Sequence, residues 1–251
     1  MRFANAAGLL ALLVGVANAA GRLQNDSYAL RPALRVGDET KIKVLVQPSQ
    51  SGADPLTIIE DRKVTDIADI GDFTIAETDK ALAADSNADP AVTVTKTWLS
   101  NGQIKEIHAD SPGYDLDSAY RAAMLTSFEI PDAPVKIGDR WSLVAPGQTD
   151  KWRSTHIDYV LSGMDKVGDT NALKVDVNGM ETEGPMPASI QGSIWLDPQT
   201  FHVLRRVYKE TSFPVPGMSN FTGTVTEVPL TSDMTTSTTS MSDPNPVPPN
   251  R

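Results

Sequence analysis

The sequence contains no cysteine, and only 6% of its residues are aromatic. The absence of cysteine excludes disulfide bonds, thiolate metal sites and thiol nucleophiles, so the packing of apolar side chains must stabilise the fold. Acidic residues outnumber basic ones by 32 to 22, and the resulting net charge of −10 disfavours binding to nucleic acid. The 251 residues, 40% of them hydrophobic, suffice for one soluble domain with its own core.

Long apolar runs are also lacking, with one exception near the N-terminus. Arg2 precedes an apolar run over residues 6–16, and the small residues Ala17, Asn18 and Ala19 follow. This order is typical of a secretory signal peptide that is cleaved after Ala19. The run has about half of the roughly 20 residues that a membrane anchor needs. We therefore expect residues 1–19 to be removed and the remaining chain to be soluble, without a membrane span, in the periplasm or outside the cell.

The chain shows signs of an internal duplication. Three short patterns occur twice in the same order, at offsets of 101, 97 and 97 residues. A shared order at nearly one offset predicts two similar halves of about 100 residues. The matching segments are 35–38 and 136–139, 69–72 and 165–169, and 97–103 and 194–200.

Each half is expected to form antiparallel β-strands. The Gly-Asp pairs of the repeated patterns suit turns, because glycine adopts positive φ and aspartate bonds to nearby backbone. Between them, apolar and polar residues alternate, which is typical of strands with one buried and one solvated face. The pair Asn101 and Gly102 predicts a hairpin. We expect about ten strands, among them segments 41–46, 92–98, 104–108, 140–144, 173–177, 190–196, 201–208 and 221–226.

One helix is expected between the halves. Asp117 or Ser118 can cap its N-terminus, and the helix must end before Pro131. We expect a helix over residues 117–128 that covers the open face of the sheet, with a partner-binding amphipathic helix as the alternative. Its apolar face carries Tyr120, Ala123, Met124, Ser127 and Phe128.

The predicted fold is mainly β: a curved antiparallel sheet, half-barrel or barrel, built from two similar halves with one short covering helix. It forms a single domain over residues 20–230, with halves at about 28–112 and 131–228. From Thr231 onward the chain is rich in Ser, Thr and Pro. Such a composition buries too little apolar surface to offset its ordering entropy, so residues 231–251 are expected to form a disordered tail.

Two stretches carry a family resemblance. Residues 131–141 contain a proline followed by Val-x-Ile-Gly-Asp-x-Trp, and residues 192–200 form a Gly-Ser-Ile-Trp-Leu-Asp hairpin. Both resemble elements of uncharacterised exported bacterial β-rich proteins. The overall plan is also similar, more loosely, to the half-barrel periplasmic carriers of lipoproteins or lipids, which implies a role in binding apolar ligands in the envelope. Neither resemblance implies catalytic residues.

The sequence has no local signature of catalysis or metal binding. The three histidines, His108, His156 and His202, lack the short spacing of a zinc site, and no Gly-x-Ser-x-Gly or phosphate-binding glycine loop occurs. The acidic segment 85–89 lacks the glycine and glutamate of a calcium loop, and Asp110, Asp115 and Asp117 are expected to be solvated. We expect no catalytic residues, metal or cofactor.

Two proline-rich loops are unusually apolar. Residues 184–187 contain Met186, and residues 213–218 contain Phe213 and Met218. Because methionine adapts to irregular apolar partners, these three residues are the candidates for binding a ligand. The alternative is that the loops fold back onto the core.

The sequence thus predicts an exported, non-enzymatic protein that binds a lipid-like or other apolar ligand. One alternative is a structural or interaction protein of the envelope or surface, with an envelope protein as its partner. A second alternative is a hydrolase whose acidic residues come together only in the fold.

Overall fold

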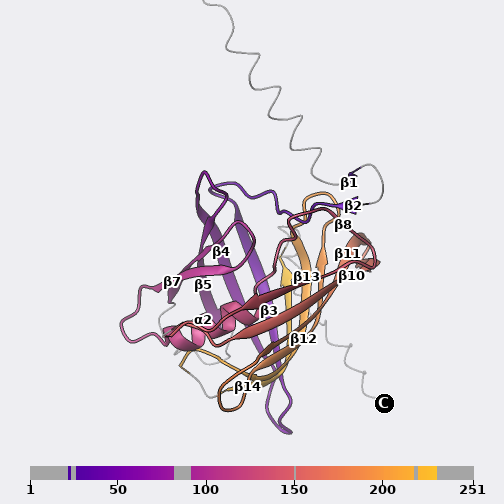
Figure 1. Cartoon of the computed structure of the whole chain (residues 1–251). Helices are drawn as coiled ribbons and strands as arrows, with labels where there is room; N and C mark the ends of the chain where they lie inside the picture. The colour runs from indigo at the N-terminus through magenta and orange to yellow at the C-terminus, as the bar shows by residue number, and fades with distance from the viewer. Residues whose placement is uncertain (1–21, 24–26, 82–91, 150, 218–219, 231–251) are drawn as a thin grey trace, which may run out of the picture.

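The computed structural model describes residues 22–23, 27–81, 92–149, 151–217 and 220–230 (Figure 1). The predicted signal peptide, the predicted tail, the acidic segment 85–89 and Met218 lie outside these ranges.

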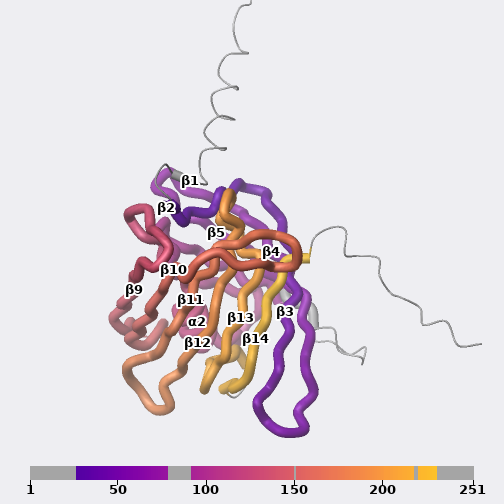
Figure 2. Tube along the Cα trace, turned by 90° about the vertical axis from the view of Figure 1, so that its right-hand side faces the viewer, coloured from indigo at the N-terminus to yellow at the C-terminus, as the bar shows by residue number. Residues whose placement is uncertain are grey.

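An antiparallel sheet of 11 strands makes up most of the fold, in the order β7-β6-β5-β4-β3-β14-β13-β12-β11-β10-β9. It curves strongly but does not close, so β7 and β9 are its two edges (Figures 1 and 2). The predicted curved antiparallel sheet is confirmed in its open form. The strands are β3 (Glu39–Pro48), β4 (Leu56–Ile67), β5 (Phe73–Ala81), β6 (Thr93–Trp98), β7 (Ile104–Ala109), β9 (Arg140–Ala145), β10 (Thr155–Val167), β11 (Thr170–Glu181), β12 (Ser189–Leu196), β13 (Val203–Phe213) and β14 (Phe221–Pro229).

A second, small sheet lies beside the large one. It joins β1 (Arg22–Leu23), β2 (Ser27–Tyr28) and β8 (Val135–Lys136), all of two residues. The segment before the first half is thereby attached to the segment that opens the second half.

The two halves have the same strand order. Strands β3 to β7 run up and down in sequence, and β9 to β13 repeat this arrangement. The last strand, β14, pairs with both β13 and β3 and joins the halves in the middle of the sheet.

The Gly-Asp turns that open the two halves have the same hydrogen bonds. The Gly37 N–H donates to the Val64 carbonyl at 2.8 Å, and the Gly138 N–H donates to the Leu161 carbonyl at 2.7 Å. Both glycines have φ near +95° (+93° and +96°), which favours glycine over any residue with a Cβ. Val64 and Leu161 also both precede a bulge in their strand. The repeat seen in the sequence is therefore a repeat of structure.

The third repeated pattern matches in topology but not in register. Trp98 pairs with Phe73 and packs against the core. Trp195 alternates with the buried Ile194 and therefore faces outward, where its indole N–H donates to Asp165 at 2.9 Å. The equivalent positions Lys96 and Ile194 lie 98 residues apart, whereas the two tryptophans lie 97 residues apart, so Trp195 sits one position before the equivalent of Trp98.

The two ends of the sheet differ in character. The Gly-Asp turns, the β6–β7 hairpin and the β12–β13 hairpin all lie at one end, here called the turn end. Residues 49–55, 146–154, 182–188 and 214–217 connect strands at the opposite end, here called the loop end. In Figure 2 the β3–β4 and β11–β12 hairpins both lie at this lower end.

The described residues contain one α-helix, α2 (Leu116–Leu125), which begins and ends earlier than the predicted 117–128. Its N-cap is Asp115, not Asp117 or Ser118, because the Asp115 carboxylate accepts the Ser118 N–H at 3.1 Å. The helix packs against β7, β10 and β11 and so covers part of the concave face of the sheet, as expected. Within the described ranges, no helix has the length and apolar character needed to cross a bilayer.

After α2, residues 126–130 span the gap between the two sheet edges. The Ile130 N–H donates to the Asn101 carbonyl in the β6–β7 hairpin at 2.7 Å, and Trp141 of β9 donates to the Glu129 carbonyl at 2.7 Å. Phe128 packs edge-on against Trp141 and Tyr159, whose rings are stacked 5.4 Å apart. We call residues 126–130 the bridging segment.

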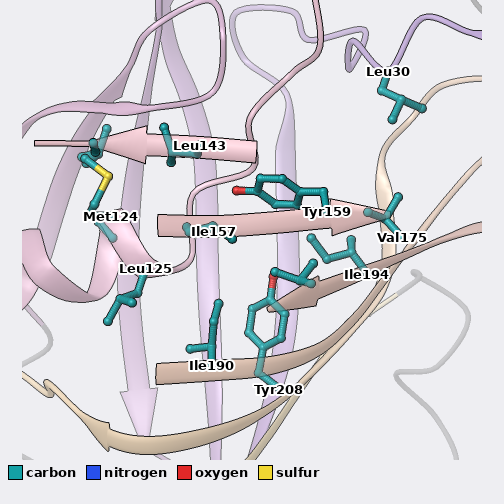
Figure 3. Packing of buried hydrophobic residues seen from close by; sticks show 14 of the residues in the cluster. Leu30, Met124, Leu125, Leu143, Ile157, Tyr159, Val175, Ile190, Ile194 and Tyr208 are labelled. Carbon is teal, nitrogen blue, oxygen red and sulfur yellow. The ribbon is translucent and has the colours of Figure 1, made fainter. Parts of the chain in front are cut away.

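The main apolar core lies between α2, the bridging segment and the concave face of the second half (Figure 3). Tyr159 reaches into it from β10, donates its hydroxyl to the Ser127 carbonyl at 2.7 Å and accepts the Glu129 N–H at 3.3 Å. Other fully buried members include Met124, Leu125, Leu143, Ile157, Leu161, Val175, Ile190 and Ile194.

We expect Tyr159→Phe to lower the free energy of unfolding by about 1–3 kcal/mol, because it leaves two backbone groups of the bridging segment without a partner. Tyr208→Phe is the matched control, since the Tyr208 hydroxyl is equally buried but has no hydrogen-bond partner among the described residues. Urea unfolding of both variants measures the difference. Equal stabilities of the two variants would contradict the role given to Tyr159.

Candidate functional site

The concave face of the first half carries charged side chains where a core would be expected. The pairing register places all of them on the same face as the buried residues of the second half. We call this set the charged cluster. Its members are Glu60 and Arg62 of β4, Glu77 of β5, Lys96 of β6, Arg206 and Glu210 of β13, and Glu227 of β14.

The repeat shows that four of these charges replace core residues. Since Val64 and Leu161 are equivalent, counting along the strands and across the ladder aligns the halves position by position. Each charged residue of the first half then corresponds to a fully or almost fully buried residue of the second. The equivalent pairs are Glu60 and Ile157, Arg62 and Tyr159, Glu77 and Val177, and Lys96 and Ile194.

Ion pairs link most members of the charged cluster. Arg62 bonds to Glu60 and lies 3.6 Å from Glu77 and 3.7 Å from Glu227. Lys96 bonds to Glu77, and Arg206 Nη1 lies 3.3 Å from Glu227. The side chains of Arg62 and Lys96 each remain 24% exposed, so the charged cluster can be reached from solvent.

Three buried hydrogen-bond donors have no partner in the described part of the chain: the Trp98 indole on β6, and the Tyr208 hydroxyl and Nε of Arg206, which lie next to each other beside these pairs. Both residues lie on β13 and point to the same face, with the guanidinium carbon 5.7 Å from the centre of the tyrosine ring. A Cβ at Gly192 would lie 2.9 Å from this ring and 1.9 Å from the Val207 carbonyl oxygen, so the ring needs a glycine beside it on β12. Buried donors left unpaired cost free energy and are rare in native proteins.

Glu210 is the least compensated acid of the charged cluster. It is 4% exposed and makes no hydrogen bond or ion pair with a described residue. Burial, together with repulsion from Glu227, raises the pKa of Glu210 to about 8 against the weaker effect of Arg206. Burial also raises the pKa of Tyr208 to about 12. Glu210 is therefore mostly uncharged at neutral pH.

The pKa values of the other acids in the charged cluster depend on the balance between burial and the nearby cations. Burial raises the pKa of Glu60 above its usual range although Arg62 opposes the change. Lys96 and Arg62 outweigh the effect of burial on Glu77 and lower its pKa. In the same way, Arg206 and Arg62 lower the pKa of Glu227. The charged cluster thus contains firmly ionised and readily protonated carboxyl groups side by side.

Apolar side chains surround the charged cluster without joining the main core. Ile42 and Val44 of β3 and Val64 of β4 are buried on the concave face, yet they lie outside the core cluster that contains α2. This part of the concave face therefore offers both apolar surface and unpaired donors.

The structure separates the residues that the sequence suggested for ligand binding. Met186 is 68% exposed in the β11–β12 loop, whereas Phe213 is buried in the main core. The backbone of Gly217 bonds to the Asp115 cap of α2, so the loop after Phe213 folds back towards the core. Met218 lies outside the described residues, and the two described candidates do not form one site.

The histidines and acids considered for metal binding lie apart. His156 contacts Asp158 and His202 contacts the Ala33 carbonyl, both at exposed positions. Asp110 accepts the Thr93 N–H and Asp115 caps α2. Within the described ranges, no three His, Asp or Glu side chains are placed to hold a metal ion.

Two small pockets occur outside the charged cluster. One, of about 210 Å³, lies at the turn end between Arg31, Phe73 and Ile130, and the other, of about 240 Å³, lies at the loop end beside α2. Both are smaller than the roughly 300 Å³ of a typical small-molecule site, so each has room for a small chemical group only.

Sequence reasoning missed the charged cluster because its members come from five strands. Alternation assigns polar residues to a solvated face, and here they share the concave face with the apolar ones. The available signal was the pair Glu60 and Arg62, which places charges at positions that the second half fills with Ile157 and Tyr159.

Comparison with protein-family models, with curated proteins and with solved structures finds no match to this chain.

We expect Glu210→Gln to remove a loss of stability at alkaline pH. Because the folded-state pKa of Glu210 is raised, wild-type stability falls as pH rises from the unfolded value through about 8. Urea unfolding should show the variant close to wild type at about pH 5 and more stable, on the order of 2–4 kcal/mol, at about pH 9. Glu106→Gln, an exposed site on β7, is the control. The same difference at both pH values would refute this assignment.

Proposed function

We propose that the protein is an exported, non-catalytic binding protein and that its ligand occupies the charged part of the concave face. The observation that carries the proposal is the pair of buried donors without partners, the Tyr208 hydroxyl and Nε of Arg206. The signal-like N-terminal sequence supports export to the periplasm or the outside of the cell.

The chemistry of this surface favours a lipid-like ligand with a carbonyl group. Two unpaired N–H and O–H donors need an acceptor oxygen, and Ile42, Val44 and Val64 offer apolar contact next to them. With Glu210 uncharged, three carboxyl groups stand against three cations, so the charged cluster does not call for a ligand with a full negative charge. An acyl ester or amide combines an apolar tail with an uncharged acceptor oxygen and meets all three conditions.

The divergence of the two halves supports the same conclusion. On β10 to β12 the concave face is mainly apolar and is covered by α2 and the bridging segment. In the first half, the equivalent positions carry charges that cost desolvation free energy and contribute little to stability. Retaining such groups inside a fold is common where they bind something.

We expect Tyr208→Phe to weaken binding of the monoacylglycerol monolaurin by about 5–10-fold, because one hydrogen bond to the ester carbonyl is lost. Isothermal titration of the two proteins measures the change. Tyr28→Phe, on β2 and outside the charged cluster, should bind as wild type does. Mass spectrometry of organic extracts from protein purified from its native host then identifies the natural ligand. Absence of monolaurin binding, together with an organic extract that contains no lipid-like molecule, would contradict the proposal.

A second candidate function is ester hydrolysis, favoured by Glu210, a buried carboxyl group protonated near neutral pH beside Tyr208 and Arg206. A proton donor of this kind next to polar groups is typical of acid–base catalysis. Release of lauric acid from monolaurin by wild type, and its loss in Glu210→Gln, would favour this function over binding alone. A stable complex without turnover would exclude it for this substrate.

A further inference from the structure

The loop-end pocket gathers cations on a protein that is acidic overall. It lies between α2 and the loop that joins β9 to β10, and has a volume of about 240 Å³. Arg121, Lys151 and Arg153 supply three positive charges to a lining whose one carboxylate is Asp117, and the ion-paired Glu181 lies beneath it. Gln148 and Trp152 complete the lining.

A buried carboxylate beneath the pocket fixes both arginines. The Glu181 side chain is 0% exposed and accepts Nε and Nη2 of Arg121 at 2.6 and 2.9 Å, and Nη1 of Arg153 at 3.2 Å. It also accepts the Ala188 N–H at 2.9 Å. Burial raises the pKa of Glu181, but these bonds outweigh it and lower the pKa, so the group stays ionised.

Each guanidinium keeps donors that Glu181 does not use. Nη1 of Arg121 and Nη2 of Arg153 make no hydrogen bond with any residue that the structure describes. The Pro185 carbonyl accepts a hydrogen bond from Nη1 of Arg153 at 3.1 Å. This carbonyl and the shared carboxylate hold the guanidinium groups in place, so little side-chain entropy is lost when an anion binds.

The third cation is also held in position. Nζ of Lys151 lies 5.5 Å from the ring centre of Tyr120 and 5.7 Å from that of Trp152, and it donates to the Lys105 carbonyl at 3.4 Å. The loop itself is closed by the Gln148 N–H, which donates to the Trp152 carbonyl at 2.9 Å, and by the Trp152 indole, which donates to the Pro146 carbonyl at 3.1 Å. The pocket is therefore formed before any ligand arrives.

We infer that this pocket is a binding site for a small oxyanion, a phosphate or carboxylate group, held by Arg121, Arg153 and Lys151. Planar guanidinium groups match the oxygens of such anions, and the ammonium group adds an unspecific charge. The volume suits a single anionic group, either free in solution or at the head of a lipid. This site is separate from the charged cluster and does not depend on the function proposed above.

The test compares wild type with Lys151→Gln and Gln148→Glu, using inorganic phosphate and acetate as probes at an ionic strength of about 0.15 M. Neither variant touches Glu181, so the fold is retained, which circular dichroism verifies. We expect wild type to bind phosphate with a Kd of about 1 mM or tighter in isothermal titration. Lys151→Gln should weaken binding at least about 5-fold, and Gln148→Glu more strongly, because it adds a negative charge to the lining.

Two controls keep the result specific. Lys166→Gln removes an exposed lysine at the turn end and should bind phosphate as wild type does. Tyr208→Phe should also leave phosphate binding unchanged, which separates this site from the concave face. The inference is overturned if wild type binds neither phosphate nor acetate, or if Lys166→Gln loses as much affinity as Lys151→Gln.

Vesicles distinguish the source of the anion. Co-sedimentation with vesicles of phosphatidylcholine and phosphatidylglycerol, but not of phosphatidylcholine alone, and its loss in Lys151→Gln, would assign the site to anionic lipid headgroups. Phosphate binding without vesicle binding would assign it to a free anion.

Discussion

An open sheet has two edges whose backbone groups and inner face must be covered, and this requirement governs the fold. The bridging segment meets it by bonding to the β6–β7 hairpin through Ile130 and to β9 and β10 through Trp141 and Tyr159. Helix α2, directly before it, covers the apolar part of the concave face. Edges covered in this way are less prone to pair with another chain.

Much of the fold could be predicted from local patterns. The Gly-Asp turns, the Asn101–Gly102 hairpin and the period-two alternation located β3, β6, β7, β9 and β11 to β14, because each pattern depends only on neighbouring residues; β4 and β5 were not among the expected segments. The helix boundaries were wrong by a few residues, since Asp115 caps α2 from further upstream than the apolar spacing suggested. The third repeated pattern was aligned by its tryptophans, but connections of different length before this hairpin place Trp195 on the opposite face.

The charged cluster and the loop-end pocket could not be predicted from the sequence, for a different reason. Glu227 and Arg62 meet only because β14 pairs with β3, 160 or more positions away along the chain, and Glu181 meets Arg121 only because α2 crosses the concave face. Contacts of this kind depend on topology, which local periodicity does not encode. What the sequence did contain was the repeat, and the repeat shows where one half departs from the other. A duplicated scaffold can keep one interior for stability and change the second for another use.

The pairing of β14 with β3 has a consequence for how the chain folds. Of the described strands, β14 is the last along the chain and completes the middle of the sheet, so one side of β3 stays unpaired until β14 is available. Long-range closure of this kind slows folding and prolongs the exposure of unpaired strands to aggregation.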